Sequence, residues 1–578
     1  MAYFFLLRQI WRYAEGDRFK IPAYIVIHLL SYLGGLARPL ILAQILNTLQ
    51  RNPADLMAQT GTWMLVWVGC YFWSTLLHRL GRYMEAHTSY QVERNFRRDA
   101  YRQITHLPLK WHNDHHSGDT INRLNTAASA LRVFADKQFE YMGYVMGFWG
   151  PLAALLVLSW QVAAMALAMA VLTIATVKFF DGKLVPLYKA QNSAYHRISA
   201  AFFDYISNIK TIISLKLGAP TEAELTQRLD DAYPPYMEAE AKINSLKWFF
   251  VSTLGFTLEA GVIFYYIWLQ HASGSVVMAG SLVAVFQYLQ SLNGSFHNIA
   301  HQYQAIVNMK INVDTASPIL DEMRDTVLEA PRQPDWQRIV VRGLDFAHTA
   351  ERATLVDVAL DIGRGKRIAL VGESGSGKSS LLAVLRHLYA ADRATVAVDG
   401  QPADLAQVAA LATLIPQEPE LFENTIRYNI ALDLPYSDDE IDAVVKLSTF
   451  DRLLGQLPRG LDTDIRERGV SLSGGERQRL ALARGLLAAR DSSILLLDEP
   501  TSSVDAANET TVYENILSQF AGCAIIAALH RLHLLAKFDY VIVMDQGRIV
   551  QQGDFETLKN ESGPFQDLWR RYQAEPVD

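Results

Sequence analysis

A short loop rich in glycine and serine is the part of this sequence best suited to chemistry. The loop consists of Gly372, Glu373, Ser374, Gly375, Ser376, Gly377, Lys378 and Ser379. It follows an apolar run at 367–371 that is typical of a strand and precedes a run at 379–385 that is typical of a helix. Free backbone N–H groups at a helix start bind polyphosphate oxygens, and glycines let the backbone come close to them. A chance glycine-serine loop is the alternative, but the strand before it and the helix after it favour a phosphate-binding loop.

Four side chains have predicted chemical roles around this loop. Lys378 is expected to reach the β- and γ-phosphates, and the Ser379 hydroxyl to ligate Mg²⁺. An apolar run at 493–497 predicts a buried strand that ends in Asp498 and Glu499. We expect Asp498 to serve Mg²⁺, directly or through water, and Glu499 to polarise or deprotonate the attacking water. The alternative for the two carboxylates is an ordinary acidic turn after a core strand.

Length and composition limit the class of protein. The chain has 578 residues, which is enough for two or more domains, and half of them are apolar while 20% are charged. A formal net charge of −7 argues against a general nucleic-acid binder. Cys70 and Cys523 lie too far apart in sequence to suggest a disulfide framework or a metal cluster. Residues 1–13 lack the pattern of a cleavable signal peptide and are expected to form an amphipathic helix on the membrane face.

Long uncharged stretches in the first half predict six membrane-spanning helices, because a helix needs about 20 apolar residues to cross a bilayer. The expected spans are 21–50, 56–78, two within 141–177, 248–270 and 275–300. A tight turn near 159–161 is expected to divide the stretch at 141–177 into helices three and four. Arg38 and Glu259 are the charges that interrupt the first and fifth spans.

The distribution of basic residues orients this half of the chain. Lysine and arginine gather in the long loops on one side of the predicted spans, and that side is expected to be cytoplasmic. A polar, proline-containing segment at 317–336 then predicts a linker between a membrane domain at 1–316 and a nucleotide-binding domain at 337–578. Beyond the linker, strand-like and helix-like runs alternate, as in an α/β domain.

Further motifs follow the phosphate loop in a characteristic order. They place Gln417, then Ser473, Gly474, Gly475 and Glu476, then Asp505, and finally His530. With these motifs the sequence resembles, along essentially its whole length, an ATP-binding cassette (ABC) exporter half-transporter of the bacterial lipid and multidrug type, such as the lipid A flippases. The resemblance implies an all-α six-helix transmembrane domain followed by an α/β P-loop nucleotide-binding domain.

The resemblance also implies roles for these residues, with ATP and Mg²⁺ as the bound groups. Ser473 to Glu476 match the signature loop that caps the γ-phosphate of a nucleotide held by the opposite chain. Gln417 matches the glutamine that touches Mg²⁺ and faces the membrane domain, and His530 matches the switch histidine near the γ-phosphate. Asp505 matches the loop that crosses the dimer interface. The segments 111–123 and 203–215 match the cytoplasmic loops that transmit motion to the membrane helices.

Four positions depart from the family pattern. His348 stands where an aromatic residue usually stacks on adenine, with Phe346 as the less favoured candidate because its strand parity points to the core. Ser380 replaces a usual threonine, Val504 a usual leucine, and Arg466 a usual glycine. None of these changes removes a catalytic group.

The sequence defines the substrate less well than the nucleotide site. His78, Arg79 and Arg82 suggest a cationic inward cavity for an amphipathic anion, while the alternative is a structural Arg38–Glu259 pair with arginines that reach the interface. Many aromatic residues in the spans suit a lipid or drug site, and lipid-facing packing explains them equally well. His112, His115 and His116 are irregularly spaced, which disfavours a metal site.

The expected activity is ATP-driven export or leaflet flipping of a lipid, lipid conjugate or drug. One phosphate loop and one signature loop per chain predict a dimer of half-transporters, with a homodimer favoured over a heterodimer. An importer built on the exporter fold and a regulatory ATPase anchored in the membrane are the alternatives. The predicted location is the bacterial inner membrane, with the nucleotide-binding domain in the cytoplasm.

Overall fold

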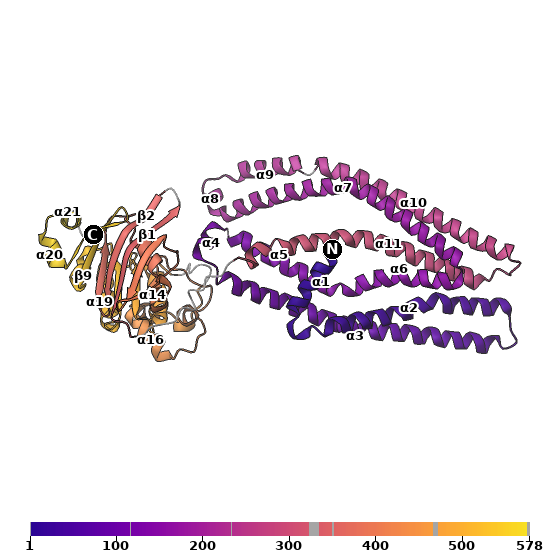
Figure 1. Ribbon diagram of the computed structural model, residues 1–578, viewed down its shortest axis with the longest axis horizontal. Coiled ribbons are helices and arrows are strands. Elements are labelled where there is room, and N and C mark those ends of the chain that lie inside the picture. The colour runs from indigo at the N-terminus through magenta and orange to yellow at the C-terminus, as the bar shows by residue number, and fades with distance from the viewer. Residues whose placement is uncertain are drawn as a thin grey trace. The chain divides into compact units, whose positions relative to one another are not determined.

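The computed structural model describes residues 2–115, 117–232, 234–322, 335–349, 352–465 and 472–574. Its contacts divide the chain into two units: unit 1 holds Met1–Ile104 and Gly118–Asp321, and unit 2 holds Thr105–Ser117 and Glu322–Asp578 (Figure 1). The short segment 105–117 therefore packs with the C-terminal part of the chain. Arg466, His116 and most of the predicted linker lie outside the described residues.

Unit 1 consists of helices, several of them long and side by side (Figure 1). They are α1 (Ala2–Tyr13), α2 (Lys20–Arg51), α3 (Leu56–Ile104), α5 (Ser117–Asp136), α6 (Gln138–Leu158), α7 (Trp160–Ser207), α8 (Ile209–Ser214), α9 (Gly218–Ala232), α10 (Pro234–Ala272), α11 (Ala279–Asp314) and α12 (Ser317–Leu320). Helix α2 packs along α3, and α10 packs along α7. Helix α1 is amphipathic as expected: Leu6 and Ile10 are buried, while Arg8 and Arg12 are exposed.

The predicted turn near 159–161 is confirmed. Ser159 has an extended backbone (φ −166°, ψ 116°) between α6 and α7, and its hydroxyl accepts a hydrogen bond from the Val162 N–H at 3.5 Å. A serine at this position satisfies one of the free N–H groups of the new helix. The long apolar stretch therefore forms two helices.

Several helices extend far beyond the predicted spans. Helix α3 has 49 residues, which at about 1.5 Å per residue gives roughly 70 Å, against a bilayer core of about 30 Å. Within the described residues, four segments are long and apolar enough to cross a membrane: Glu15–Arg51, Gln138–Leu158, Trp160–Leu184 and Met237–Ala272. The predicted spans in α3 and α11 are helical as well, but they are too polar to meet this criterion.

Unit 2 is built on two sheets. The four-stranded antiparallel sheet has the order β2-β1-β4-β5, and the six-stranded sheet has the order β10-β9-β3-β8-β7-β6. The first contains β1 (Arg338–Thr349), β2 (Arg352–Gly363), β4 (Arg393–Val398) and β5 (Gln401–Ala403). The second contains β3 (Arg367–Val371), β6 (Ala412–Ile415), β7 (Ile494–Asp498), β8 (Ala524–Ala528), β9 (Tyr540–Asp545) and β10 (Arg548–Gly553). Strand β10 runs antiparallel to β9, and the other pairings in this second sheet are parallel.

Helices cover these sheets, and the principal ones carry the sequence motifs at their starts. Unit 2 holds α4 (Leu109–Asp114), α13 (Lys378–Leu385), α14 (Leu405–Leu411), α15 (Ile426–Ala431), α16 (Asp438–Leu447), α17 (Asp451–Leu454), α18 (Gly474–Ala488), α19 (Ala506–Gln519), α20 (Phe555–Asn560) and α21 (Pro564–Ala574). The central strands are apolar along their length because both of their faces are buried. Strands β3, β8 and β7 are parallel neighbours, so the loops that follow them meet at one edge of the sheet.

Candidate nucleotide site

The phosphate loop connects β3 to α13, as predicted. Gly372 has φ +151°, and a Cβ there would lie 2.2 Å from the Met544 carbonyl oxygen. Gly377 has φ +104° and is the residue before α13. Both positions need glycine, the first because of close contact with a neighbouring strand and the second because of its left-handed backbone. The loop therefore keeps its backbone N–H groups at the start of α13.

Lys378 folds back over this loop. Its ammonium group donates to the carbonyl oxygens of Gly372 at 2.9 Å and Glu373 at 3.3 Å, and the side chain is buried. Burial lowers the pKa of Lys378, while the nearby Glu499 and Asp498 carboxylates act in the opposite direction. The ammonium group of Lys378 is thus bonded to neutral carbonyl oxygens of the loop. Such a cation suits the binding of a polyanion.

The predicted carboxylates lie beside the loop, at the end of β7. The Ser379 hydroxyl donates to Asp498 Oδ1 at 2.8 Å, and burial raises the pKa of Asp498. Glu499 has a left-handed backbone (φ +46°), and its carboxylate accepts a hydrogen bond from Gln417 Nε2 at 3.4 Å. The structure therefore brings together Lys378, Ser379, Asp498, Glu499 and Gln417, which come from three separate segments of the sequence.

The residues at this edge fit a nucleoside triphosphate and Mg²⁺. The Ser376 hydroxyl is buried in the loop and has no hydrogen-bond partner among the described residues. The hydroxyl of Ser379 and the carboxylate of Asp498 are oxygen donors of the kind that Mg²⁺ prefers. The N–H groups of the loop and the ammonium of Lys378 suit the phosphate oxygens.

On β1, Phe346 follows the predicted strand parity, and the pairing with β2 then shifts register between Phe346 and Ala347. Phe346 is buried in the core, whereas His348 is exposed and its Nε2 lies 3.2 Å from the hydroxyl of Ser380 on α13. The His348 ring stands edge-on to Tyr389, with 5.0 Å between the centroids. The Tyr389 hydroxyl accepts a hydrogen bond from Asn113 of α4 at 2.8 Å. His348 is therefore the accessible ring beside the phosphate loop, and Tyr389 is a neighbour that the sequence did not single out.

The signature residues form the start of α18. Ser473 caps this helix: its N–H donates to Glu476 Oε2 at 2.7 Å, and its hydroxyl accepts from the Glu476 N–H at 3.4 Å. Gly475 lies close to the backbone of Ser503, and a Cβ there would be 2.7 Å from the Ser503 carbonyl oxygen. Gly474 is the first residue of the helix. These side-chain bonds stay within one helical turn, and within the described part of the chain none reaches residues 372–379.

Asp505 and His530 lie in the loops after β7 and β8. Asp505 caps α19, since its carboxylate accepts from the Asn508 N–H at 3.0 Å and from the Asn508 side-chain amide at 2.7 Å. These bonds hold the pKa of Asp505 below its usual range. His530 and Glu499 both line one small cavity. The residue that matches the switch histidine thus lies near the carboxylate expected to act on water.

Gln478 is a positioning residue whose role the sequence motifs did not reveal. This buried side chain on α18 donates to the Gln417 carbonyl oxygen at 3.2 Å and to the Ser502 hydroxyl at 2.7 Å. Its carbonyl oxygen accepts from the Ser503 N–H at 2.7 Å. Gln478 thereby ties the signature helix to the loops that carry Gln417 and Asp505. The signal in the sequence that could have pointed to Gln478 is a glutamine on the buried face of an amphipathic helix.

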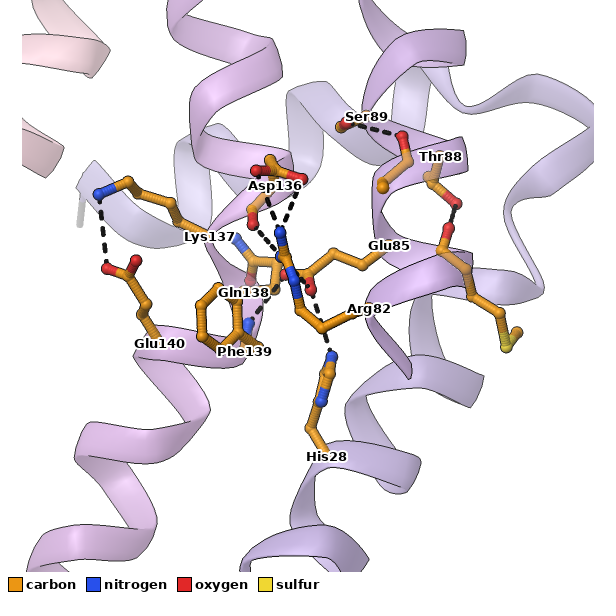
Figure 2. Close-up of polar contacts among 12 residues, drawn as sticks. His28, Arg82, Glu85, Thr88, Ser89, Asp136, Lys137, Gln138, Phe139 and Glu140 are labelled. Carbon is orange, nitrogen blue, oxygen red and sulfur yellow. Dashed lines mark hydrogen bonds and ion pairs between the residues drawn. The ribbon is translucent and has the colours of Figure 1, made fainter. Parts of the chain in front are cut away.

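In unit 1, one of the two arginines proposed for an anionic cavity, Arg82, is already paired (Figure 2). Arg82 donates to Glu85 Oε2 at 2.7 Å and to Asp136 Oδ1 at 3.3 Å, and its guanidinium lies 4.2 Å from the centre of the Phe139 ring. Glu85 is fully buried and also accepts from the Phe139 N–H at 2.8 Å. Arg82 therefore acts in a helix contact, and its charge is balanced by two carboxylates.

The alternative structural pair is also not formed. Within the described residues no ion pair joins Arg38 to Glu259, although Glu259 is buried. Of the clustered histidines, His115 stacks on Trp111 with 4.2 Å between the ring centroids. No group of three potential metal-ligating side chains is found in the part of the chain that the structure describes.

The chain matches two family models. The first, "ABC transporter transmembrane region", matches residues 21–296, and the second, "ABC transporter", matches residues 355–502. A putative ABC transporter ATP-binding protein, exp8, of Streptococcus pneumoniae is 26% identical over 88% of each chain. An ATM1-type heavy metal exporter of Novosphingobium aromaticivorans is 32% identical over 52% of this chain and 50% of its own length.

A solved structure supports the same fold. A bacterial Atm1-family ABC exporter with ATP bound aligns with a TM-score of 0.81 over 97% of this chain and 100% of its own, at 23% identity. This likeness confirms the predicted order of a helical transmembrane domain followed by an α/β nucleotide-binding domain. The two family models match the same two regions of the chain in the same order. The chain is therefore a multi-pass ABC transporter with the exporter-type fold, and its membrane helices and its ATP-hydrolysing domain lie on one polypeptide.

Proposed function

We propose that this protein exports an amphipathic compound, or flips it between leaflets, as a dimer of half-transporters in a bacterial inner membrane. The observation that carries the dimer is the geometry of the two anion-binding helix starts. Helix α13 begins at the phosphate loop, whereas α18 begins at a signature turn whose capping hydrogen bonds are local. Each chain thus supplies half of two composite sites. A homodimer is the simpler assembly because Glu499 is present.

The roles of the residues follow from their positions. Lys378 and the loop N–H groups bind the phosphates, and Ser379, Asp498 and Gln417 are placed to hold Mg²⁺. Mg²⁺ supplies neutralisation of the charge that develops on the phosphates.

Glu499 orients and deprotonates the attacking water, and His530 contacts the γ-phosphate. His348 stacks on the base. Ser473, Gly474, Gly475 and Glu476 cap the nucleotide of the second chain, and Asp505 lies at the interface between the chains.

The substrate class is supported by composition and by relatives. Exposed aromatic residues on the membrane helices, such as Phe72, Trp73, Phe256 and Phe264, favour an amphipathic lipid or drug. Because a relative is named a heavy metal exporter, a metal complex is the second candidate. Because Arg82 is paired with carboxylates, it is not available to bind an anionic substrate. The exposed Arg79 is then the main arginine on which the anionic-substrate hypothesis depends.

The first experiment measures ATP turnover by the chain alone in lipid discs, beside Glu499→Gln. We expect the substitution to lower kcat about 100-fold or more, because it removes the general base. Glu514→Gln on α19 is the matched control, since Glu514 forms only a surface ion pair with Lys537. A folded wild-type chain without turnover would contradict the homodimer and indicate a second type of subunit.

A transport assay then tests the direction and the substrate. ATP-dependent uptake into inverted vesicles supports export, while uptake only by intact cells supports the importer alternative. Lipids, drugs and thiol complexes of heavy metals are compared by their stimulation of turnover. Stimulation by none of them, with no movement of any, would favour the regulatory ATPase.

A further inference from the structure

A buried glutamate on α19 has both of its oxygens occupied. Glu509 is 5% exposed, and its Oε1 accepts a hydrogen bond from the Thr501 hydroxyl at 2.7 Å. Its Oε2 accepts from the guanidinium of Arg531 at 2.9 Å. A buried carboxylate is stable only when it is paired and hydrogen-bonded. Glu509 therefore connects Thr501 and Arg531 through its two oxygens.

These two partners are close in sequence to the proposed catalytic residues. Thr501 lies two residues after Glu499, and Arg531 directly follows His530. The same guanidinium nitrogen of Arg531 also donates to the Val504 carbonyl oxygen at 3.0 Å, directly before Asp505. One side chain on α19 thus connects the loop after β7 with the loop after β8.

The space between these groups is small. A cavity of about 60 Å³ is lined by residues from both loops and from α19. Its lining includes Glu499, Thr501, Glu509, Tyr513, His530 and Arg531. Glu509 therefore lines the same small cavity as the two proposed catalytic side chains.

The backbone of Glu499 explains why such support is needed. Its left-handed conformation (φ +46°) is unfavourable for a residue with a side chain and persists only when its surroundings hold it in place. The bond from Thr501 to Glu509 anchors the chain two residues further on. Without that anchor, the loop is free to relax toward a more favourable conformation.

We propose that Glu509 is a positioning residue that, through Thr501 and Arg531, holds the segments of Glu499 and His530 in one arrangement. The proposal rests on the proposed roles of those two residues. Glu509 lies on α19, whereas the phosphate loop and His348 lie on other elements. Its loss should therefore affect the rate of hydrolysis more than the binding of ATP.

The test compares Glu509→Gln with Glu514→Gln in the full chain in lipid discs. Both substitutions remove one carboxylate from α19, but Glu514 is exposed and forms only its surface pair with Lys537. We expect Glu509→Gln to lower kcat at least about tenfold with KM for ATP changed less than about twofold, since misplaced catalytic groups slow the chemistry. The control should match the wild type.

A second variant and a double variant complete the test. Thr501→Val removes the hydrogen bond to Glu509 without removing a charged side chain, and it is expected to lower kcat as well. It therefore still tests the proposal if Glu509→Gln does not fold. In a Glu499→Gln background, Glu509→Gln should cause little further loss, because residues that act as one unit are not additive.

Unchanged kcat in both Thr501→Val and Glu509→Gln would overturn the proposal, and so would a rise in KM equal to the fall in kcat. If Glu499→Gln itself leaves turnover intact, the proposed function has failed at an earlier step. If Glu499→Gln abolishes turnover while Glu509→Gln and Thr501→Val leave kcat unchanged, only the role of Glu509 is wrong.

Discussion

Each unit contains a buried glutamate that is paired with an arginine, and the two pairs have different surroundings. In unit 1, Glu85 is fully buried, and it joins Arg82, His28 and the Phe139 N–H at the break between α5 and α6 (Figure 2). In unit 2, Glu509 joins Arg531 and Thr501 beside the proposed catalytic loops. The same chemistry therefore holds a helix junction in one unit and the arrangement of a candidate active site in the other.

The comparison teaches that the role of a buried ion pair depends on what its partners are attached to. The Glu85 partners lie in α2, α3 and the start of α6, which are parts of a helical bundle. The Glu509 partners lie in loops next to Glu499 and His530. Loss of the first pair should mainly lower stability, and loss of the second should mainly lower the rate.

The largest expected effect is that of Glu85→Ala. This change leaves Arg82 and His28 without their shared carboxylate and leaves the Phe139 N–H unpaired. Removal of one partner of a buried pair costs about 3–5 kcal/mol, so the unfolding temperature in lipid discs should fall markedly. Glu224→Ala, which breaks an exposed pair with Arg228, is the control and should change little.

A second measurement compares ATP turnover by the folded fraction of the Glu85→Ala protein with turnover by Glu509→Gln. We expect kcat per folded molecule to stay closer to the wild type than in Glu509→Gln. A stable Glu85→Ala protein with a large loss of kcat would show that the two pairs act alike, and the comparison would then fail.

An intermediate effect is expected for Gln478→Leu. Gln478 links its neighbours through neutral hydrogen bonds, whereas Glu85 and Glu509 do so through ion pairs. Leucine keeps the bulk of the side chain but loses three hydrogen bonds and leaves the Ser503 N–H unpaired. An unsatisfied buried donor costs about 1–3 kcal/mol. Thermal unfolding temperature and ATP turnover should both decrease.

The matched control for this prediction is Gln519→Leu at the end of α19. Gln519 is exposed, so the same change of residue type there removes no buried hydrogen bond and should leave stability and turnover unchanged. Equal stability and equal turnover in Gln478→Leu and Gln519→Leu would contradict the positioning role of Gln478.

The smallest effect is expected at Asp505, an exposed carboxylate that caps α19. Asp505→Ala should cost about 1 kcal/mol, whereas Asp505→Asn should retain the cap. Because folding lowers the pKa of Asp505, its charge stabilises the fold above the pKa of the unfolded chain. That contribution is lost as the pH falls through the lower pKa of the folded state.

Chemical unfolding across the acid range checks this prediction. The difference in stability between the wild type and Asp505→Asn should shrink as the pH falls, since asparagine does not titrate. A difference that is constant with pH would show that the charge of Asp505 contributes nothing.

Local patterns made much of the fold predictable. The phosphate loop lies between a strand and a helix because its motif specifies both neighbours, and Ser159 ends one helix and caps the next. Alternation along β1 placed Phe346 inside, whereas His348 lies beyond a shift of register and is exposed. Each of these predictions depends on residues close together in sequence.

The contacts that hold the site were less predictable because their partners are distant in sequence. Gln478 bonds residues 61 and 24 positions away, and Arg531 bonds a carboxylate 22 positions away. Arg82 was interpreted as a cavity residue from its place toward the inner part of a predicted span, and its partner Asp136, 54 positions away, was not foreseen. A sequence shows that a buried charge needs a partner, but only the fold selects which one.

The grouping of residues 105–117 with the C-terminal unit has a consequence for how the protein is made. Asn113 of α4 leaves the ribosome 276 residues before Tyr389, whose hydroxyl accepts its hydrogen bond. Helix α4 can therefore form this contact only after the domain that carries Tyr389 has been synthesised. An ATP-binding domain expressed alone from residue 335 would lack this helix, and its surface around Tyr389 would differ from that in the whole protein.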